Sequence, residues 1–505
     1  MLGVVRESVL AALFGTSEAM DAFRVAFRVP NLLRDLFAEG AMSAAFVPTF
    51  TQRLTTSRAA ALTLGTYLTN ALLLGTGVLV VLGLIFADPL VRLLVTDSYA
   101  ADPERLALTV MLARIMLPFL TFIALAAAAM GMLNSMRHFF IPALSPAMFN
   151  VVSIACAVGL IPVMIWLGFE PIAAAAVGTL LGGFAQWAVQ WPLLRREGFR
   201  YRPALDWRDD GLQRVLLLMG PGTIGLAATQ INVAVNTYLA TGEETGAVSS
   251  LEYAFRLMYL PIGLFGVSVA TATTPVVARF AALGDHASIR RTVADSVALM
   301  MALNVPAAVG LVVLAIPIVQ LMYERGQFTP AATIGTAGAL QFYALGLVGY
   351  SVVRIASPVF YALGAARTPV KVSIATVAVN AGLNVMLVRV MGFQGLALGT
   401  SIAALFNATT LLILLSRRID GVNGVRIAAA LARMSLAAAA MGAAAYVIHD
   451  LLPAVVPGRG IVPEAIRLAI TIGAAILVLA GAAHLLRIEE FQRASAAVLR
   501  RLRRR

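Results

Sequence analysis

Long apolar runs separated by short polar ones recur along the whole chain, and most of the runs are long enough to cross a bilayer. Because a helix rises about 1.5 Å per residue, about 20 apolar residues span a hydrocarbon core of ~30 Å. The pattern therefore predicts an all-α polytopic membrane protein with about 14 transmembrane helices. In chain order the predicted spans are 1–14, 22–50, 62–87, 106–133, 139–167, 171–194, 214–240, 248–278, 292–321, 332–362, 370–390, 395–416, 427–449 and 464–486.

Composition supports the membrane class and argues against a nucleic-acid partner. Hydrophobic residues make up 60% of the 505 residues and charged residues only 12%, more apolar surface than a water-soluble fold can bury. The net charge of +13 is spread over short loops and one tail, which argues against nucleic acid and for contact with anionic membrane lipids. Cys156 is the single cysteine, which excludes a disulfide within the chain and argues against a thiolate metal site.

The basic residues are divided unevenly between alternate loops. One set of loops, together with the tail at 487–505, contains 24 Lys and Arg residues, whereas the other set contains five. Since loops rich in Lys and Arg stay on the cytoplasmic side, this bias predicts cytoplasmic basic loops and a cytoplasmic C-terminus. We expect the tail to contact anionic lipids of the inner leaflet.

A repeat divides most of the chain into two related halves. Ala26-Phe27-Arg28 recurs as Ala254-Phe255-Arg256, and Arg137 and Asn150 recur as Arg367 and Asn380. These matches predict two parallel six-helix lobes followed by two additional helices. The predicted parts are an N-terminal lobe at 1–194, a cytoplasmic connector at 195–213, a C-terminal lobe at 214–416, two extra helices at 417–486 and the basic tail at 487–505. Met1 aligns with Thr229, inside the seventh span, so we expect the first helix to be truncated.

One stretch, Asp21 to Phe50, combines apolar runs with ionisable residues. Continuous helical phase places five of its six charges within a sector of about 60°, and Pro30 can kink the helix before the sixth, Arg34. Ionisable groups at membrane depth are costly and usually face a water-filled cavity or the bundle interior. We therefore interpret the stretch as lining a cavity; the alternative is a surface helix whose charges are solvated. The six residues are Asp21, Arg24, Arg28, Arg34, Asp35 and Glu39.

The sequence lacks the patterns that enzymes of this size usually show. Its four histidines are scattered and lie mostly near the ends of predicted spans, which argues against a metal site or an acid–base pair. The phosphate-binding pattern GxxxxGK[ST] is absent, so nothing indicates an ATPase. We expect no enzymatic activity and no cofactor.

Four motifs resemble the MurJ/MviN family of lipid II flippases, which belongs to the multidrug/oligosaccharidyl-lipid/polysaccharide exporter superfamily. They are FRVPNLLRDLFAEGAMSAAFVPTF, GMLNSMRHFFIPALSPAMFN, SLEYAFRLMYLPIGLFGVSVATATTP and YERGQFT. The resemblance covers residues 1 to about 416. It implies two six-helix lobes around a central cationic cavity, and two extra helices that form a groove for the undecaprenyl tail. It also implies alternating-access transport of lipid II across the bacterial inner membrane for peptidoglycan synthesis, with the cell-wall synthesis machinery as a possible partner.

The resemblance also assigns candidate substrate-binding residues. The family's functional arginines map onto Arg6, Arg34 and Arg256, and two further basic positions of the family map onto Arg28 and Arg354. The chemistry agrees with this assignment, because a pyrophosphate requires several donors and the planar guanidinium group offers bidentate contacts that stay charged.

Acidic residues near these arginines leave a second interpretation open. Glu7, Asp21, Asp35 and Glu39 are the candidate supporting acids, and Asp21 matches an aspartate of the family. In the alternative interpretation, each arginine is paired with one of these acids and only fixes the packing of the helices.

The driving force stays open as well. Some members of the family build a sodium site with aspartates, whereas the matching positions here are Asn236, Asn380 and Asn384, with Thr400 nearby. Amide and hydroxyl oxygens can bind a hard cation, but without a carboxylate its charge is uncompensated. The asparagines could equally join helices through hydrogen bonds. Coupling to the membrane potential and coupling to a monovalent cation are both candidates.

Two other functions stay open. The main alternative function is a cation-coupled drug or polysaccharide-lipid exporter of the same superfamily, and the other is a membrane scaffold without transport.

Overall fold

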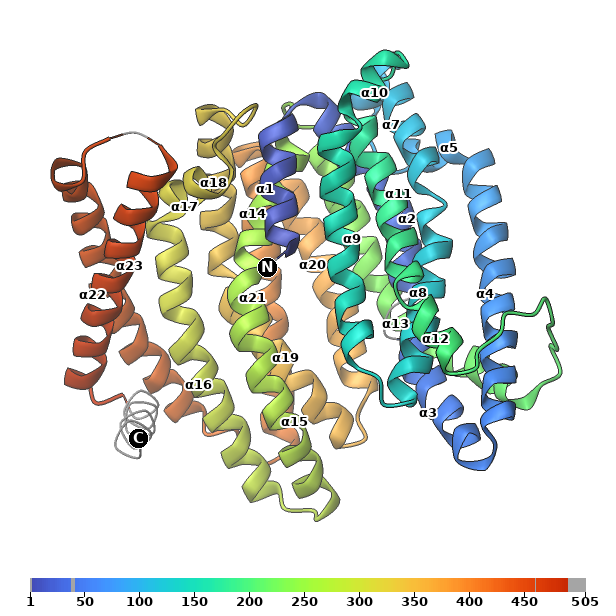
Figure 1. Cartoon of the computed structure of the whole chain (residues 1–505). Coiled ribbons are helices and arrows are strands. Elements are labelled where there is room, and N and C mark those ends of the chain that lie inside the picture. The colour runs from blue at the N-terminus through green and yellow to red at the C-terminus, as the bar shows by residue number, and fades with distance from the viewer. Residues whose placement is uncertain (1, 38–40, 459, 489–505) are drawn as a thin grey trace. The chain divides into compact units, whose positions relative to one another are not determined.

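The computed structural model describes the backbone of residues 2–37, 41–458 and 460–488, and every regular element in these ranges is a helix (Figure 1). Side chains are described in the same ranges except at 35–37, 41–44 and 220–229. The predicted all-α fold class is therefore confirmed.

Nine helices in the described part of the chain are long and apolar enough to cross a membrane, or up to ten if a bent pair counts as one span. The bent pair is α18 (Pro330–Leu345) and α19 (Leu347–Ala362), which meet at 41°. Shorter or more polar helices do not reach this standard: α1 (Leu2–Phe14) has 13 residues, and α2 (Glu18–Phe37) contains Asp21 and three arginines. A polytopic fold is thus supported, while the total of 14 spans stays a prediction. The nine helices are α4 (Arg58–Ile85), α7 with α8 (Pro103–Ser135), α9 (Phe140–Gly159), α14 with α15 (Ala247–Ala282), α16 (His286–Val313), α20 (Arg367–Met391), α21 (Phe393–Arg418), α22 (Gly424–Val455) and α23 (Ile461–Leu485).

Prolines explain where predicted spans divide into shorter helices. The predicted span 106–133 consists of α7 (Pro103–Met116) and α8 (Phe119–Ser135), with Pro118 as the residue before α8. The predicted span 139–167 ends in a separate helix, α10 (Ile161–Trp166), which has a proline in its first turn. Proline lacks a backbone N–H, and the first turn of a helix tolerates this because its N–H groups have no partner within the helix.

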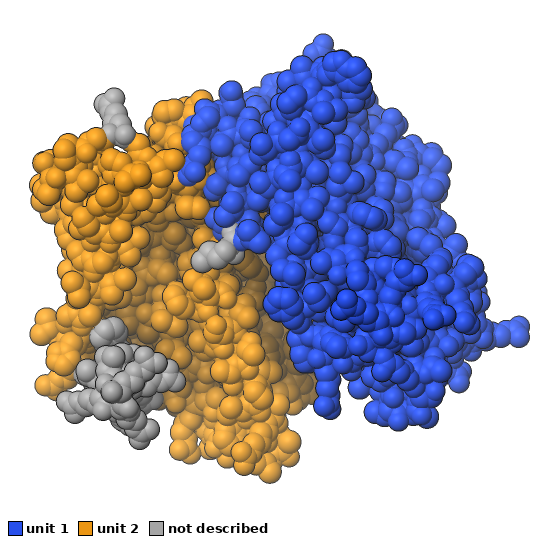
Figure 2. Space-filling view, in the orientation of Figure 1, with its two compact units in different colours: residues 1–249, 325–328 blue, residues 250–324, 329–505 orange. Residues whose placement is uncertain are grey.

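The chain packs into two compact units (Figure 2). Unit 1 comprises residues 1–249 and 325–328. Its main core lies between α3 (Ala41–Thr56), α4 and α8, where Phe46, Phe50 and Leu64 are fully buried. Its other helices are α5 (Ala87–Arg92), α6 (Asp97–Ala100), α11 (Ala173–Ala188), α12 (Trp191–Arg196) and α13 (Asp210–Thr241).

The predicted cytoplasmic connector folds against unit 1. Asn70 of α4 donates hydrogen bonds to the carbonyls of Arg202 and Ala204 at 2.7 and 2.8 Å, and Arg53 forms an ion pair with Asp209 at 2.9 Å. The next helix, α13, packs on α3 and so belongs to unit 1. The lobe boundaries predicted from the repeat stay a prediction, because packing and sequence repetition divide a chain by different criteria.

Unit 2 comprises residues 250–324 and 329–505. Its main core lies between α16, α19, α21 and α22, where Val297, Ile355 and Leu411 are buried. Helix α22 packs on both α16 and α23, so the two helices predicted outside the repeat belong to the same compact unit. The remaining helices are α14 (Ala247–Pro261), the π-helix η1 (Ile262–Gly266), α15 (Val267–Ala282) and α17 (Ala315–Tyr323).

Candidate functional site

The first two helices bring one glutamate and two arginines together. Glu7 of α1 is only 1% exposed, and its two carboxylate oxygens accept hydrogen bonds from Arg6 at 2.7 Å and from Arg24 of α2 at 2.5 Å. The guanidinium group of Arg6 also lies 5.2 Å from the centroid of the Phe149 ring. Both guanidinium groups therefore converge on one buried carboxylate, which orients the two arginines relative to each other.

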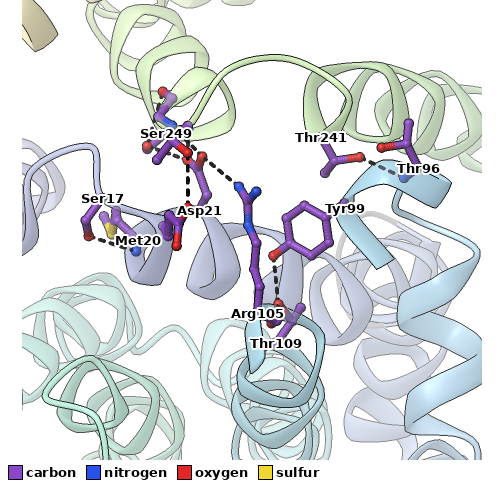
Figure 3. Close-up of polar contacts among 12 residues, drawn as sticks. Ser17, Met20, Asp21, Thr96, Tyr99, Arg105, Thr109, Thr241 and Ser249 are labelled. Atoms are coloured by element: carbon purple, nitrogen blue, oxygen red, sulfur yellow. Dashed lines mark hydrogen bonds and ion pairs between the residues drawn. The ribbon is translucent and has the colours of Figure 1, made fainter. Parts of the chain in front are cut away.

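Asp21, in the first turn of α2, holds the start of α14. Its carboxylate accepts hydrogen bonds from the backbone N–H of Gly246 at 2.7 Å, from the backbone N–H of Ser249 at 2.9 Å and from the Ser249 hydroxyl at 2.6 Å (Figure 3). The first N–H groups of a helix lack partners within the helix, and a negative charge there also interacts favourably with the helix dipole. Asp21 therefore fixes the beginning of the helix that carries Arg256.

Arg105 contributes a positive charge beside Asp21. Its Nη2 lies 3.6 Å from Oδ2 of Asp21, and its guanidinium group lies 4.1 Å from the centroid of the Tyr99 ring (Figure 3). The Tyr99 hydroxyl is in turn hydrogen-bonded to the hydroxyl of Thr109 at 2.7 Å. This chain of contacts ties the first turns of α7 to the first turn of α2.

The other charged residues of the stretch from Asp21 to Phe50 lie further along α2. Arg28 and Arg34 are both half-buried, which leaves part of each side chain accessible to a ligand. Helix α2 continues through Pro30. The side chain of Asp35 and the whole of Glu39 lie outside the described residues.

The two remaining candidate arginines lie in unit 2. Arg256 is half-buried in α14, and Arg354 of α19 donates a hydrogen bond to the hydroxyl of Tyr259. The Arg354 guanidinium group lies 5.5 Å from the centroid of the Tyr259 ring, against which Phe255 also packs. The π-helix η1 follows α14 directly, and such local widenings of a helix are frequent at functional sites.

The residues predicted as a weak cation site make contacts typical of helix packing. Asn384 donates a hydrogen bond to Asn380, one turn earlier in α20, at 2.7 Å and lies against Gly399 of α21. Thr400 donates its hydroxyl to a carbonyl of its own helix, and Asn236 lies in α13 of unit 1. Among the described residues, no group of three or more His, Cys, Asp or Glu could hold a metal ion. A monovalent cation site stays a prediction.

The structure groups part of the predicted set and adds residues to it. Arg6 meets Glu7, the pairing that the alternative interpretation expects, whereas Asp21 lies in a different cluster. Sequence reasoning did not identify Arg24 as the second partner of Glu7 or Arg105 as the partner of Asp21. The helical phase that Arg24 shares with Asp21 was a signal for the first, and no local pattern indicates the second.

Comparison with known proteins identifies a family. Residues 10–459 match the model of the family described as Lipid II flippase MurJ. A "Probable lipid II flippase MurJ" from Rhizobium meliloti is 35% identical over 467 residues, which cover 90% of this chain and 84% of that protein. Another from Bdellovibrio bacteriovorus is 33% identical over 507 residues, which cover 98% of this chain and 93% of that protein.

Solved structures share the fold. A lipid II flippase MurJ in an inward closed conformation matches with a TM-score of 0.76 and 25% identity, over 96% of this chain and 97% of that one. An inward-facing multidrug resistance MATE family transporter matches with a TM-score of 0.70 over 83% of this chain and 95% of that one. Its identity is 16%, so this second likeness shows the fold alone.

Proposed function

The chain belongs to the MurJ family of lipid II flippases, and from this premise we propose that it carries lipid II from the cytoplasmic to the outer leaflet of the bacterial inner membrane. It is a transporter rather than an enzyme, and it works by alternating access, in which the substrate site opens first to one side and then to the other. The observation that carries the proposal is the match of residues 10–459 to the family. The half-buried arginines of helices α2 and α14 support it.

In the proposed site, arginine side chains bind the pyrophosphate of the substrate. Each guanidinium group can donate two parallel hydrogen bonds to phosphate oxygens and remains charged at any physiological pH. The buried acids keep this positive charge in place: Glu7 orients Arg6, and Asp21 fixes the helix that carries Arg256. The proposed binding residues are Arg6, Arg28, Arg34, Arg256 and Arg354, with Glu7, Asp21, Asp35 and Glu39 in support.

Depletion and complementation test the proposal. Cells depleted of this protein should accumulate lipid II in the inner leaflet, and growth should return with the wild-type gene. Arg34→Ala and Arg256→Ala should fail to restore growth although both proteins reach the membrane, and Arg→Lys at either position should restore it only partly, because a point charge loses the bidentate geometry. Arg279→Ala, which removes an exposed arginine from the last turn of α15, is the matched control and should restore growth fully. Normal growth with Arg34→Ala or Arg256→Ala at native expression would contradict the assigned roles.

The proposed topology has 14 spans with the basic loops and the C-terminus in the cytoplasm. The charge bias between alternate loops supports it. With Cys156 replaced by Ser, single cysteines introduced at Arg58 and His286 should react with a membrane-impermeant thiol reagent only after the cells are opened. A cysteine at Asp102 should react in intact cells, and the reverse pattern would contradict the orientation.

A further inference from the structure

A groove with a volume of about 720 Å³ opens on unit 1, and its lining includes none of the proposed substrate-binding arginines. It is lined by α5, by one face of α7 and by Phe169, in the turn after α10; these elements lie at the same end of the unit (Figure 1). Its floor is apolar and includes Val110 and Met111, and its charged groups are Asp88, Arg92 and Arg114. The groove thus combines an apolar floor with cationic side chains.

Arg114 lies deep in an apolar span. Helices α7 and α8 together form one candidate span, Pro103–Ser135. At a rise of about 1.5 Å per residue, Arg114 lies roughly 16 Å along the helix axis from the first residue of this span. A charged group at this depth of a ~30 Å core is costly unless it reaches the interface or binds a counter-charge. Helical side chains incline toward the N-terminus of the helix, so the exposed Arg114 side chain extends back toward the α5 end of the groove.

The surface around the groove fits contact with lipid chains. Large apolar side chains within three residues of its lining residues in the sequence are exposed: Ile85 at 63%, Leu93 at 75% and Trp166 at 83%. Such residues are unfavourable in water and ordinary in a bilayer, and tryptophan is enriched where acyl chains meet head groups. The rim therefore places the mouth of the groove at the membrane interface.

The charges in the groove do not cancel. Arg92 uses its Nε to bind Asp88 at 2.8 Å, one turn earlier in α5, and this pair is neutral as a whole. For Arg114, no hydrogen bond or ion pair to another described residue is present. One uncompensated guanidinium group remains in a groove that Arg92 also lines, and guanidinium groups can donate to the oxygens of a phosphate.

We propose that this groove binds a membrane phospholipid with a net negative charge, whose phosphodiester lies between Arg92 and Arg114 and whose acyl chain lies along Val110 and Met111. A single excess positive charge matches the single negative charge of such a head group. A zwitterionic phospholipid has no net charge to offer, and its ammonium group would have to compete with Arg92 for Asp88. The site is separate from the proposed substrate-binding arginines and does not depend on the identity of the transported lipid.

Native mass spectrometry of the full-length protein, released from nanodiscs with equal amounts of phosphatidylglycerol and phosphatidylethanolamine, tests the site. Wild type should retain phosphatidylglycerol preferentially. Arg114→Gln should weaken that retention by about tenfold or more, since a charge-assisted bidentate contact is lost. Arg389→Gln is the matched control, because Arg389 is an exposed arginine in the last turn of another apolar helix, α20, and does not line this groove. The Arg389→Gln protein should retain as much phosphatidylglycerol as wild type does.

A second variant separates loss of the site from loss of the fold. Met111→Trp leaves both arginines in place and fills the groove, so it should also lose phosphatidylglycerol while the thermal unfolding temperature of the protein stays near that of wild type. Equal retention of the two lipids by wild type would overturn the proposal. Equal loss in Arg114→Gln and Arg389→Gln, or full retention in Met111→Trp, would overturn it as well.

Discussion

Replacing Asp21 with Asn tests whether this carboxylate secures the start of α14. The aspartate accepts three hydrogen bonds, two from backbone N–H groups and one from the Ser249 hydroxyl, at 2.6–2.9 Å, and it lies 3.6 Å from Arg105. Asparagine keeps the size but removes the charge, and it turns an NH2 group toward groups that are themselves donors. Hydrogen bonds to charged groups contribute about 1.5–3 kcal/mol, against about 0.5–1.5 kcal/mol for neutral ones. We expect Asp21→Asn to lower the free energy of unfolding by about 2–4 kcal/mol.

Denaturant titration of the purified protein in detergent micelles measures this difference. The matched control is Glu18→Gln, which changes the same kind of group in the same turn of α2. Glu18 is exposed there and accepts a hydrogen bond from the Thr245 hydroxyl at 3.3 Å. That variant should change the free energy of unfolding by less than about 0.5 kcal/mol. Because Arg256 lies about two turns beyond Ser249 on α14, Asp21→Asn should also reduce transport. If the two variants lose equal stability, the assigned role of Asp21 is refuted.

Three further predictions concern pH, backbone conformation and the driving force. The hydrogen bond from Arg58 lowers the pKa of Glu197. The stability that this pair adds is therefore present above pH ~4.3, the usual pKa of a glutamate, and is lost as the pH falls through the lowered pKa. In a plot of unfolding temperature against pH, Glu197→Gln should remove this loss at acid pH. Gly326→Ala should destabilise the protein well beyond the ~1–2 kcal/mol that a left-handed alanine costs, because its Cβ would lie 2.2 Å from the Ala12 carbonyl oxygen. Gly364→Ala has a similar positive φ but open space around the Cβ, and it should show only the smaller cost. No carboxylate occupies the predicted cation positions, so collapsing the membrane potential should slow flipping, whereas exchanging sodium for potassium at fixed potential should not. Flipping that stops without sodium would contradict this prediction.

The helices and the membrane class follow from local pattern, and so do many of the breaks. A run of some 20 apolar residues has few alternatives to a spanning helix. Pro118 and Pro162 lie where predicted spans divide, whereas α2 continues through Pro30, so a proline alone does not determine a break.

The contacts of the candidate site could not be predicted as well from the sequence, because they join residues that are far apart along the chain. Asp21 was identified as a supporting acid, but Ser249 lies 228 positions away, and only the packed structure brings the two together. The pairing of Glu7 with Arg24 depends on how α1 packs against α2, which the helical phase of one helix does not determine. Tyr259 has no sequence signal that links it to Arg354, since an exposed tyrosine in an apolar helix is common at any membrane interface.

The most direct test of the central claim is flipping of labelled lipid II in proteoliposomes that contain only the purified protein. The account predicts that wild-type protein moves lipid II between leaflets faster than protein-free vesicles do, and that Arg256→Ala abolishes this gain although it is incorporated equally well. Movement of lipid II at the protein-free rate by correctly folded wild-type protein, under an imposed membrane potential, would contradict the account.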